Sequence, residues 1–337
     1  MEHKAGRTVN ILFTSVGRRV ELMRAFRRAY STLGIEGRIV ATDIDPLAPA
    51  LQEVDCPYIV PRLDTTEYIP TLLEICQQEK VDLLFPLIDP DIPVLAANRP
   101  LFSKIGVQMA VVSPNAARLT ADKWLTAQFF ESLQLPSPRS WLPGQSIPES
   151  LDYPIFIKPR HGSAAKFTFR VEGPDELRFF LRYVPDPIIQ EFLPGPEITN
   201  DVICDLKGEV LGVISRRRIE VRWGEVAKGI TLYDPDVTSK CIKIAQALPA
   251  VGPITVQCMM KDGVPHFTEI NARLGGGVPL GIAAGADSPS WLLAKAAGIP
   301  IDIPSIGTYQ TGLYITRFDD SFFLTEADRV QMASHHL

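Results

Sequence analysis

Residues 252–279 read GPITVQCMMKDGVPHFTEINARLGGGVP, and this stretch predicts a β-hairpin. Residues 254–259 alternate and are rich in apolar side chains, as expected for a strand. Asp262-Gly263 is a strong turn signal, and residues 264–270 form the returning strand. The sequence therefore places two neighbouring antiparallel strands near the end of the chain.

The polar residues of this hairpin suggest a cation site. Glu269 and Asn271 are two residues apart, so they share one strand face, and a bend at Asp262-Gly263 brings Gln257 close to them. Three oxygen-bearing side chains are the kind of ligand set that Mg²⁺ takes, and Mn²⁺ is a second candidate ion. Arg273 continues the alternation and could contact a phosphate. The alternative is a solvent-facing hairpin edge with Arg273 in a surface ion pair.

Composition limits the classes of function. The chain has 337 residues, enough for two or three domains, and a net charge of −5 that argues against a general nucleic-acid binder. Its five cysteines are scattered without a C-x-x-C pair, which favours reduced thiols in a cytoplasmic protein. We find no signal-peptide pattern and no apolar run that could span a bilayer. We therefore expect no membrane or nucleic-acid partner.

Strands and helices alternate over residues 1–112, which predicts an open and largely parallel α/β sheet. We expect strands at 9–14, 38–42, 82–86 and 107–112. The turn Ser15-Val16-Gly17 and Asp43 invite a dinucleotide-binding interpretation. However, a full G-x-G-x-x-G is absent and Asp43 could equally cap a loop.

The middle of the chain predicts a helix at 116–133 and a flap between strands at 153–158 and 168–171. The flap loop, residues 160–166, is basic and rich in small residues, so its N–H groups could close over phosphates; an ordinary mobile hairpin is the alternative. Further strands are expected at 188–192, from 198 and at 209–218. The last ends in three arginines, which form either an anion site or a solvated basic edge.

Taken together, these motifs resemble the ATP-grasp superfamily, closest to its carbamoyl-phosphate-synthetase-like and carboxylate–amine ligase members. The resemblance covers nearly the whole chain. It implies a pre-ATP-grasp α/β domain (1–112), a linker with a small lobe (113–193) and a C-terminal lobe (194–337). It further implies that ATP contacts Lys123, Lys158, Arg160, Gly162, Ser163, Glu191, Phe192, Leu193 and Glu197. By the same resemblance Gln257, Glu269 and Asn271 hold Mg²⁺, and Arg273 contacts phosphate.

The implied reaction forms an acyl phosphate from a carboxylate and ATP, which an amine then attacks. Arg273 and Lys158 would act on the phosphoryl group, and Arg216, Arg218 and Lys228 are candidates for the acceptor site. The flap has only Gly162 where relatives often carry several glycines. A single unit also argues against carbamoyl phosphate synthesis. A non-catalytic ATP-binding protein and a nicotinamide-dependent oxidoreductase remain alternative functions. The protein could also form a homodimer.

Overall fold

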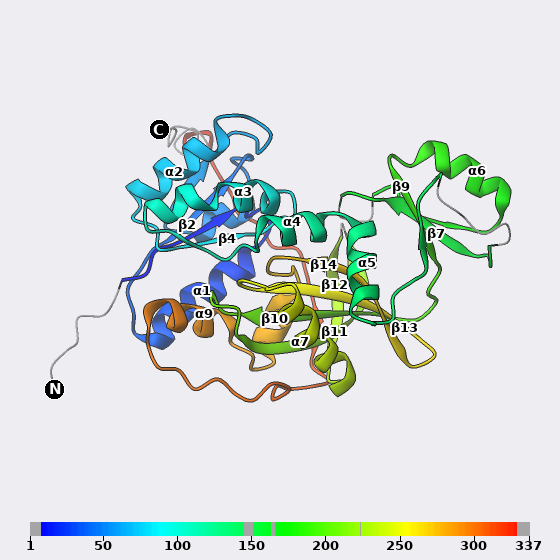
Figure 1. Cartoon of the computed structure of the whole chain (residues 1–337). Coiled ribbons are helices and arrows are strands. Elements are labelled where there is room, and N and C mark those ends of the chain that lie inside the picture. Colours follow the sequence, from blue (N-terminus) through cyan, green and yellow to red (C-terminus); the bar gives the residue numbers. More distant parts are fainter. Residues whose placement is uncertain (1–7, 145–150, 163–165, 223, 329–337) are drawn as a thin grey trace.

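The N-terminal part of the chain forms a five-stranded parallel sheet (Figure 1). The computed structural model describes residues 8–144, 151–162, 166–222 and 224–328. The strand order is β3-β2-β1-β4-β5, so the order reverses beside β1, and such a switch point opens a crevice at the carboxyl ends of the strands. The strands are β1 (Ile11–Thr14), β2 (Ile39–Asp43), β3 (Cys56–Ile59), β4 (Leu83–Pro86) and β5 (Gln108–Met109).

Helices flank this sheet, and both faces of the sheet are buried. The helices are α1 (Val20–Leu33), α2 (Tyr68–Gln78), α3 (Asp91–Lys104) and the short 3₁₀ helix η1 (Pro49–Glu53). Gly34 ends α1 with a φ of 62°, as its position in the sequence predicts. The sequence misses β3, which contains Pro57 and buries only Tyr58. The predicted strand at 107–112 is paired only at Gln108–Met109.

The predicted helix at 116–133 is in fact two helices, α4 (Pro114–Ala121) and α5 (Lys123–Ser132). Asp122 separates them because its backbone is extended and its carboxylate accepts hydrogen bonds from the N–H groups of Trp124 and Leu125. Phe130 of α5 packs on Phe267, with ring centroids 5.7 Å apart. This second helix therefore rests on the later hairpin.

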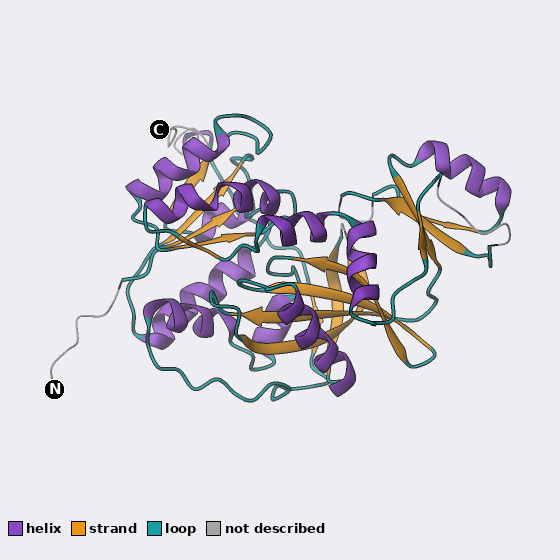
Figure 2. Ribbon diagram, in the orientation of Figure 1, coloured by secondary structure: helices purple, strands orange, loops and turns teal. Residues whose placement is uncertain are grey.

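The small lobe is a four-stranded antiparallel sheet of order β6-β9-β7-β8 with one helix (Figure 2). The strands are β6 (Ser140–Trp141), β7 (Ile155–Pro159), β8 (Phe169–Val171) and β9 (Pro187–Glu191), and the helix is α6 (Pro174–Tyr183). The sequence predicts 136–150 as a loop and so misses β6. The hydrophobic core of the small lobe consists of six buried side chains: Ile155, Ile157, Val171, Leu177, Val184 and Ile189.

The large lobe is a six-stranded antiparallel sheet of order β14-β13-β10-β11-β12-β15. The strands are β10 (Glu197–Cys204), β11 (Val210–Arg222), β12 (Glu225–Leu232), β13 (Ile254–Lys261), β14 (Val264–Asn271) and β15 (Tyr314–Thr316). The helices are α7 (Pro235–Ala247), α8 (Val278–Ala283) and α9 (Ser288–Ala297). The predicted fold class, α/β and α+β with an N-terminal parallel-sheet domain followed by a two-lobed domain, is confirmed, and the structure adds that both lobes are antiparallel sheets.

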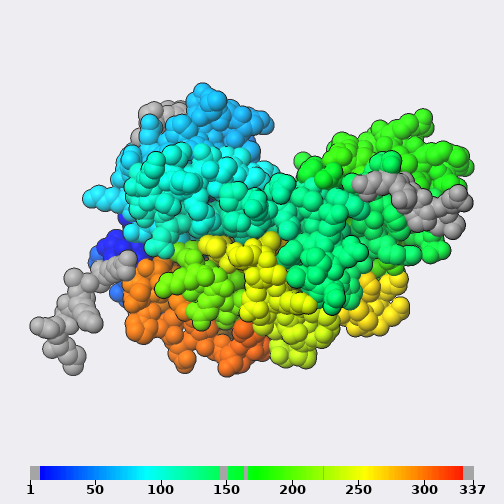
Figure 3. Space-filling model, in the orientation of Figure 1, coloured from blue at the N-terminus to red at the C-terminus, as the bar shows by residue number. Residues whose placement is uncertain are grey.

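Two hydrophobic cores run from the N-terminal sheet into the large lobe. Leu12 and Val202 share one core, while Phe13 and Ile214 share the other. Because successive strand residues point to opposite faces, Leu12 and Phe13 enter different cores. The small lobe shares neither core, and in the space-filling view it stands apart from the N-terminal domain across an indentation (Figure 3). The chain thus consists of one large body and one smaller lobe.

All five cysteines are free thiols, and only Cys56 is not fully buried. No helix within the described ranges is both long and apolar enough to cross a membrane.

Candidate active site

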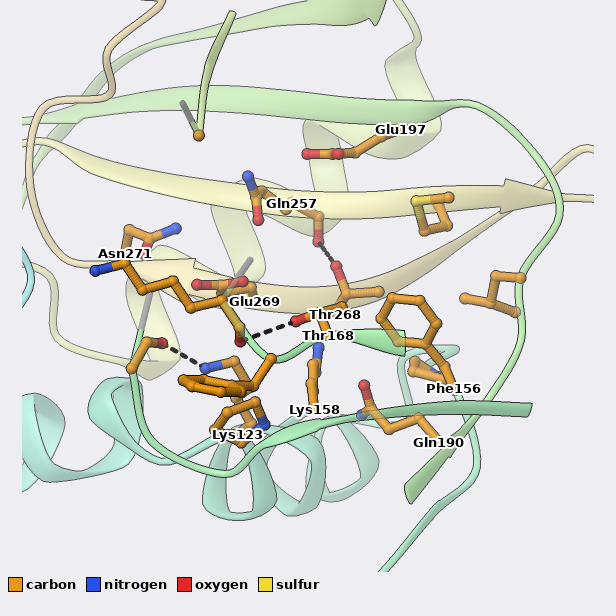
Figure 4. Close-up of a pocket in the computed structure, with 18 of the residues that line it drawn as sticks. Lys123, Phe156, Lys158, Thr168, Gln190, Glu197, Gln257, Thr268, Glu269 and Asn271 are labelled. Atoms are coloured by element: carbon orange, nitrogen blue, oxygen red, sulfur yellow. Dashed lines mark hydrogen bonds between the residues drawn. The ribbon is translucent and has the colours of Figure 1, made fainter. Parts of the chain in front are cut away.

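A cavity of about 740 Å³ lies between the small lobe and the β13–β14 hairpin. Its walls contain most of the side chains that the sequence predicts for a site (Figure 4). They are Lys123, Lys158, Gly162, Glu191, Phe192, Leu193, Glu197, Arg218, Gln257, Glu269, Asn271 and Arg273. Lys123 and Arg273, which are 273 − 123 = 150 positions apart in the sequence, therefore face one space.

The hairpin that forms one wall has the predicted geometry. Asp262 and Gly263 turn the chain with φ angles of 51° and 78°, and Gln257 pairs directly with Glu269. The register shifts between Gln257 and Cys258, so Thr268 is an extra residue. Thr268 lines the cavity beside Glu269, while Phe267 and Ile270 point into the core. The bulge therefore turns two adjacent polar side chains toward the cavity.

The oxygen atoms of this wall fit a hard cation. Directly opposed strand residues have Cβ atoms about 5 Å apart, so Gln257 and Glu269 can serve one ion. The amide nitrogen of Asn271, oriented to satisfy its neighbours, donates to Asp89 Oδ1 at 3.0 Å and to Glu269 Oε1 at 3.2 Å. Its oxygen is thereby turned away from both carboxylates. In the described part of the chain no His, Cys, Asp or Glu cluster offers a rival metal site.

Two lysines stand on the opposite side of the cavity. Lys158 is the penultimate residue of β7. Burial lowers the pKa of its ammonium group to about 8, with Lys123 adding to the decrease and Glu269 opposing it. Lys123 begins α5, and its Nζ donates to the carbonyl oxygen of Gly162 at 2.6 Å. Both cations therefore face the carboxylate wall, where an anion between them would be attracted to each.

The strand that ends the small lobe supplies a third part of the wall. Glu191 ion-pairs with Lys261 of the hairpin and with Arg139, the latter at 3.4 Å. Burial works to raise the pKa of Glu191, but the hydrogen bonds and charges of Lys261 and Arg139 together outweigh it, and the pKa falls. Phe192 lies under Arg170, and Leu193 is buried. This segment links the two lobes and leaves an apolar surface at one end of the cavity.

Two arginines also line the cavity. Arg273 Nη2 donates to Asp89 Oδ2 at 2.8 Å, and Arg218 Nη1 donates to Glu197 Oε1 at 2.7 Å. The three arginines alternate along β11, as strand geometry requires: Arg217 is exposed, while Arg216 and Arg218 are turned inward. The roles predicted for these residues stay predictions.

Several predicted residues do not reach the cavity wall. Arg160 forms a two-pronged pair with Asp122 at 2.6 and 2.8 Å. Arg216 is buried behind the wall, where its Nε donates to Asp201 at 2.9 Å. Lys228 pairs with Glu220 at 2.7 Å on the surface. Ser163 lies outside the described residues.

The buried side chain of Arg216 also explains why residue 277 is a glycine. A Cβ atom on Gly277 would lie 2.3 Å from the Arg216 guanidinium carbon, so only glycine fits there.

Sequence reasoning missed three residues near the site. Phe156 lines the cavity two residues before Lys158, so the alternation of β7 could have identified it. Thr268 lines it because of the bulge, which no sequence signal marks. Asp89 follows β4 at the carboxyl edge of the parallel sheet, where polar residues of such folds gather.

Asp43, the acidic residue on which the dinucleotide-binding interpretation depended, is engaged in the N-terminal sheet by other groups. Asp43 Oδ2 accepts a hydrogen bond from the Gly17 N–H at 2.7 Å, and Oδ1 accepts from the Asp45 N–H at 3.0 Å. The carboxylate therefore caps this loop, which is the alternative role that the sequence suggested for Asp43.

Comparisons with known proteins match this architecture. The PylC-like N-terminal domain family matches residues 11–110, and the ATP-grasp domain family matches residues 120–277. D-alanine–D-alanine ligase of Petrotoga mobilis is 25% identical over 223 residues, which cover 60% of this chain and 71% of that protein. Carbamoyl-phosphate synthase of Methanobrevibacter smithii is 25% identical over 177 residues, which cover 50% of this chain but only 46% of the synthase.

A solved structure shows the same fold. The biotin carboxylase domain of 2-oxoglutarate carboxylase from Hydrogenobacter thermophilus, in complex with MgADP and bicarbonate, superposes with a TM-score of 0.71 at 19% identity. The alignment covers 90% of this chain and 73% of that chain. The two family matches cover consecutive parts of the sequence and agree with the sheets described above. The chain therefore belongs to the ATP-grasp superfamily of ADP-forming ligases and carries a PylC-like N-terminal domain.

Proposed function

We propose that this protein is an ATP- and Mg²⁺-dependent ligase that activates a carboxylate as an acyl phosphate and joins it to an amine. One observation carries the proposal. A single cavity places two lysines opposite a wall of carboxylate and amide oxygens, with Arg273 beside them. Such a space attracts a phosphate chain from one side and its counter-ion from the other. Its volume lies within the usual range for small-molecule sites.

The side chains divide the proposed work between them. Gln257, Glu269 and Asn271 would hold Mg²⁺, which neutralises the charge of the transferring phosphoryl group. Lys158 and Lys123 would bind phosphate oxygens from the small-lobe side. Phosphoryl transfer needs positioning and charge neutralisation more than a protein nucleophile, so the scarcity of histidine in the cavity wall is no obstacle.

The remaining predicted contacts complete the proposed nucleotide site. The apolar surface formed by Phe192 and Leu193 is suited to a base, and Glu197 to hydroxyl groups. Of the three consecutive arginines of β11, Arg218 is the one that lines the cavity. We therefore assign the acceptor carboxylate to Arg218 and not to Arg216 or Lys228. The D-alanine–D-alanine ligase relative, whose name describes the joining of two amino acids, supports a carboxylate and an amine as the substrate classes.

Hydroxylamine offers a test that does not require the physiological amine. It attacks an acyl phosphate and leaves a stable hydroxamate, so ADP release that depends on one carboxylate and on hydroxylamine identifies the first substrate. A panel of amines is then screened with that carboxylate. We expect ADP, phosphate and hydroxamate in equal amounts.

The matched control is Glu269→Gln, which keeps the shape of the side chain and removes one charge. ADP release without hydroxamate from any carboxylate would contradict the proposal. Binding of MgATP with no turnover in the whole panel would instead favour the non-catalytic alternative.

A further inference from the structure

We propose that Asp89, a residue of the N-terminal domain, is a positioning residue for the metal and phosphate site of the large lobe. This inference rests on the proposed function of that site. Asp89 contacts two of its predicted members from across the domain boundary, 184 residues away from Arg273 in the sequence. It thereby ties the carboxyl edge of the parallel sheet to the end of the β13–β14 hairpin.

Asp89 uses both of its carboxylate oxygens. Oδ2 accepts from Arg273 Nη2 at 2.8 Å, and the Asn271 amide nitrogen donates to Oδ1 at 3.0 Å and to Oδ2 at 3.3 Å. Arg273 is further held by its Nη1, which donates to the Leu274 carbonyl oxygen at 3.2 Å. The Asp89 and Arg273 side chains are 25% and 14% exposed, so solvent screens this pair only in part.

Asp89 and Glu269 together select which atom of Asn271 can meet a cation. An amide side chain has one donor end and one acceptor end, and only the oxygen ligates Mg²⁺. With the nitrogen facing the two carboxylates, the oxygen is turned away from them. Asp89 makes the shorter of the two contacts, at 3.0 Å against 3.2 Å for Glu269, and Glu269 is itself a proposed ligand. Without Asp89, the amide could rotate and present its N–H₂ group to the ion.

The position of Asp89 is itself well determined. Asp91, two residues later, is fully buried, and its Oδ2 accepts hydrogen bonds from Thr14 Oγ1 at 2.6 Å and Ser15 Oγ at 2.8 Å. Ile92 N–H donates to the Asp89 carbonyl oxygen at 3.2 Å. The loop after β4 is therefore anchored to the end of β1, which is what a positioning residue requires.

A purely structural role is the competing explanation, because Asp89 also joins two domains. The chain offers a matched control in Glu225, which makes a similar junction. Glu225 pairs with Arg19 at 3.3 Å and with Arg317 at 3.1 Å, and it does not line the cavity. If Asp89 only docked the domains, replacing either carboxylate by its amide would have the same consequences.

The experiment measures ADP binding by calorimetry in excess Mg²⁺ and in EDTA. The quantity compared between variants is the dissociation constant in EDTA divided by the dissociation constant in Mg²⁺. We expect Mg²⁺ to strengthen ADP binding to the wild type. Asp89→Asn should reduce this ratio about tenfold or more, because loss of a group that orients a metal ligand typically costs 10- to 100-fold in affinity. Its affinity for ADP in EDTA should change by less than about twofold. Asp89 contacts neither the apolar end nor the two lysines, and Arg273 is assigned to the transferring phosphoryl group, which ADP lacks.

The control variant Glu225→Gln should keep the wild-type ratio even if it melts at a lower temperature. Where Asp89→Asn does not fold, Asp89→Glu replaces it; the added methylene moves the carboxylate out of register and should also lower the ratio. An unchanged ratio in a folded Asp89 variant, or an equal decrease in Glu225→Gln, would overturn the proposal. Absence of any Mg²⁺ effect in the wild type would instead overturn the proposed function and this inference with it.

Discussion

The two walls of the cavity rest on different supports. Lys158 and Phe156 stand on β7, in a lobe whose core consists of six buried side chains. Glu269 and Asn271 stand on β14, whose Phe267 and Ile270 belong to a core that continues into the N-terminal sheet. One wall can therefore move or unfold as a small unit, whereas the other is part of the main body.

The small lobe meets the main body through polar contacts. Lys123 of α5, a helix that packs on the hairpin, donates to the Gly162 carbonyl oxygen. Arg160 pairs with Asp122, and Lys261 of the hairpin pairs with Glu191. Salt bridges that solvent reaches contribute about 0–1 kcal/mol each, so these contacts can break when the lobes separate. The metal wall is therefore preorganised, whereas Lys158 on the small lobe supplies a charge whose position can change. The following predictions test that comparison, from the largest expected effect to the smallest.

The largest effect is expected from truncating the small-lobe core. Ile157→Ala removes a fully buried side chain and should destabilise the lobe by about 2–5 kcal/mol. Because that core is separate, hydrogen exchange should accelerate across residues 151–191 and remain slow in β13 and β14. Ile244→Ala in α7 is the control, since it should weaken the shared core instead. Equal loss of protection in both lobes after Ile157→Ala would show that the lobes unfold together.

Glu269→Gln and Asn271→Ala test the metal wall. Each should lower Mg²⁺-dependent turnover by about 10²–10³-fold, equivalent to ~3–4 kcal/mol of barrier, because charge stabilisation of the transferring group is lost. Melting temperature without ligand should change little, since neither side chain belongs to the hydrophobic core. Steady-state ADP release and thermal melts measure the two quantities. Turnover like that of the wild type in both variants would remove the metal assignment.

The lysine wall should show a pH dependence that the metal wall lacks. Burial lowers the pKa of Lys158 to about 8, so the ammonium group loses its proton as pH rises through this value. Phosphate favours the protonated form. The affinity for MgATP should therefore be constant below about pH 7 and fall by up to tenfold per pH unit above the pKa of about 8.

Calorimetry across pH 7–10 measures this dependence, with proton uptake on binding near pH 8 as a second readout. Lys158→Met should bind more weakly than the wild type at neutral pH and lose this dependence. An identical pH profile in that variant would exclude Lys158 as the titrating group.

The smallest effects concern the three arginines of β11. Arg217→Ala should remain within a few-fold of the wild type because its side chain is exposed. Arg218→Ala should raise the KM for the carboxylate, since Arg218 lies in the cavity wall. The affinity for MgATP should change less, because Arg218 reaches the proposed nucleotide site only through its pair with Glu197. Arg216→Ala should instead lower stability, because it strands buried Asp201 without its partner. Kinetics with the carboxylate varied, together with melts, separate the three outcomes, and equal small changes at all three positions would leave the acceptor pocket unlocated.

Local sequence was sufficient for the elements and for much of the site. The hairpin with its Asp262-Gly263 turn, the helix stop at Gly34 and the shared face of Glu269 and Asn271 follow from short-range rules. These rules hold because turn conformation and side-chain alternation depend on neighbouring residues. The position of Lys158 at the end of a strand was predictable in the same way.

Tertiary structure alone decided which charges face the cavity. Arg160, Arg216 and Arg218 each pair with a carboxylate, but only Arg218 of the three lines the cavity. None of these pairs is visible in the local sequence. Asp89 reaches Asn271 and Arg273 only because two domains share continuous cores. Strand order, bulges and domain contacts depend on residues that are distant along the chain. The sequence therefore determined the kinds of groups available for the site, and long-range packing determined which of them face the cavity.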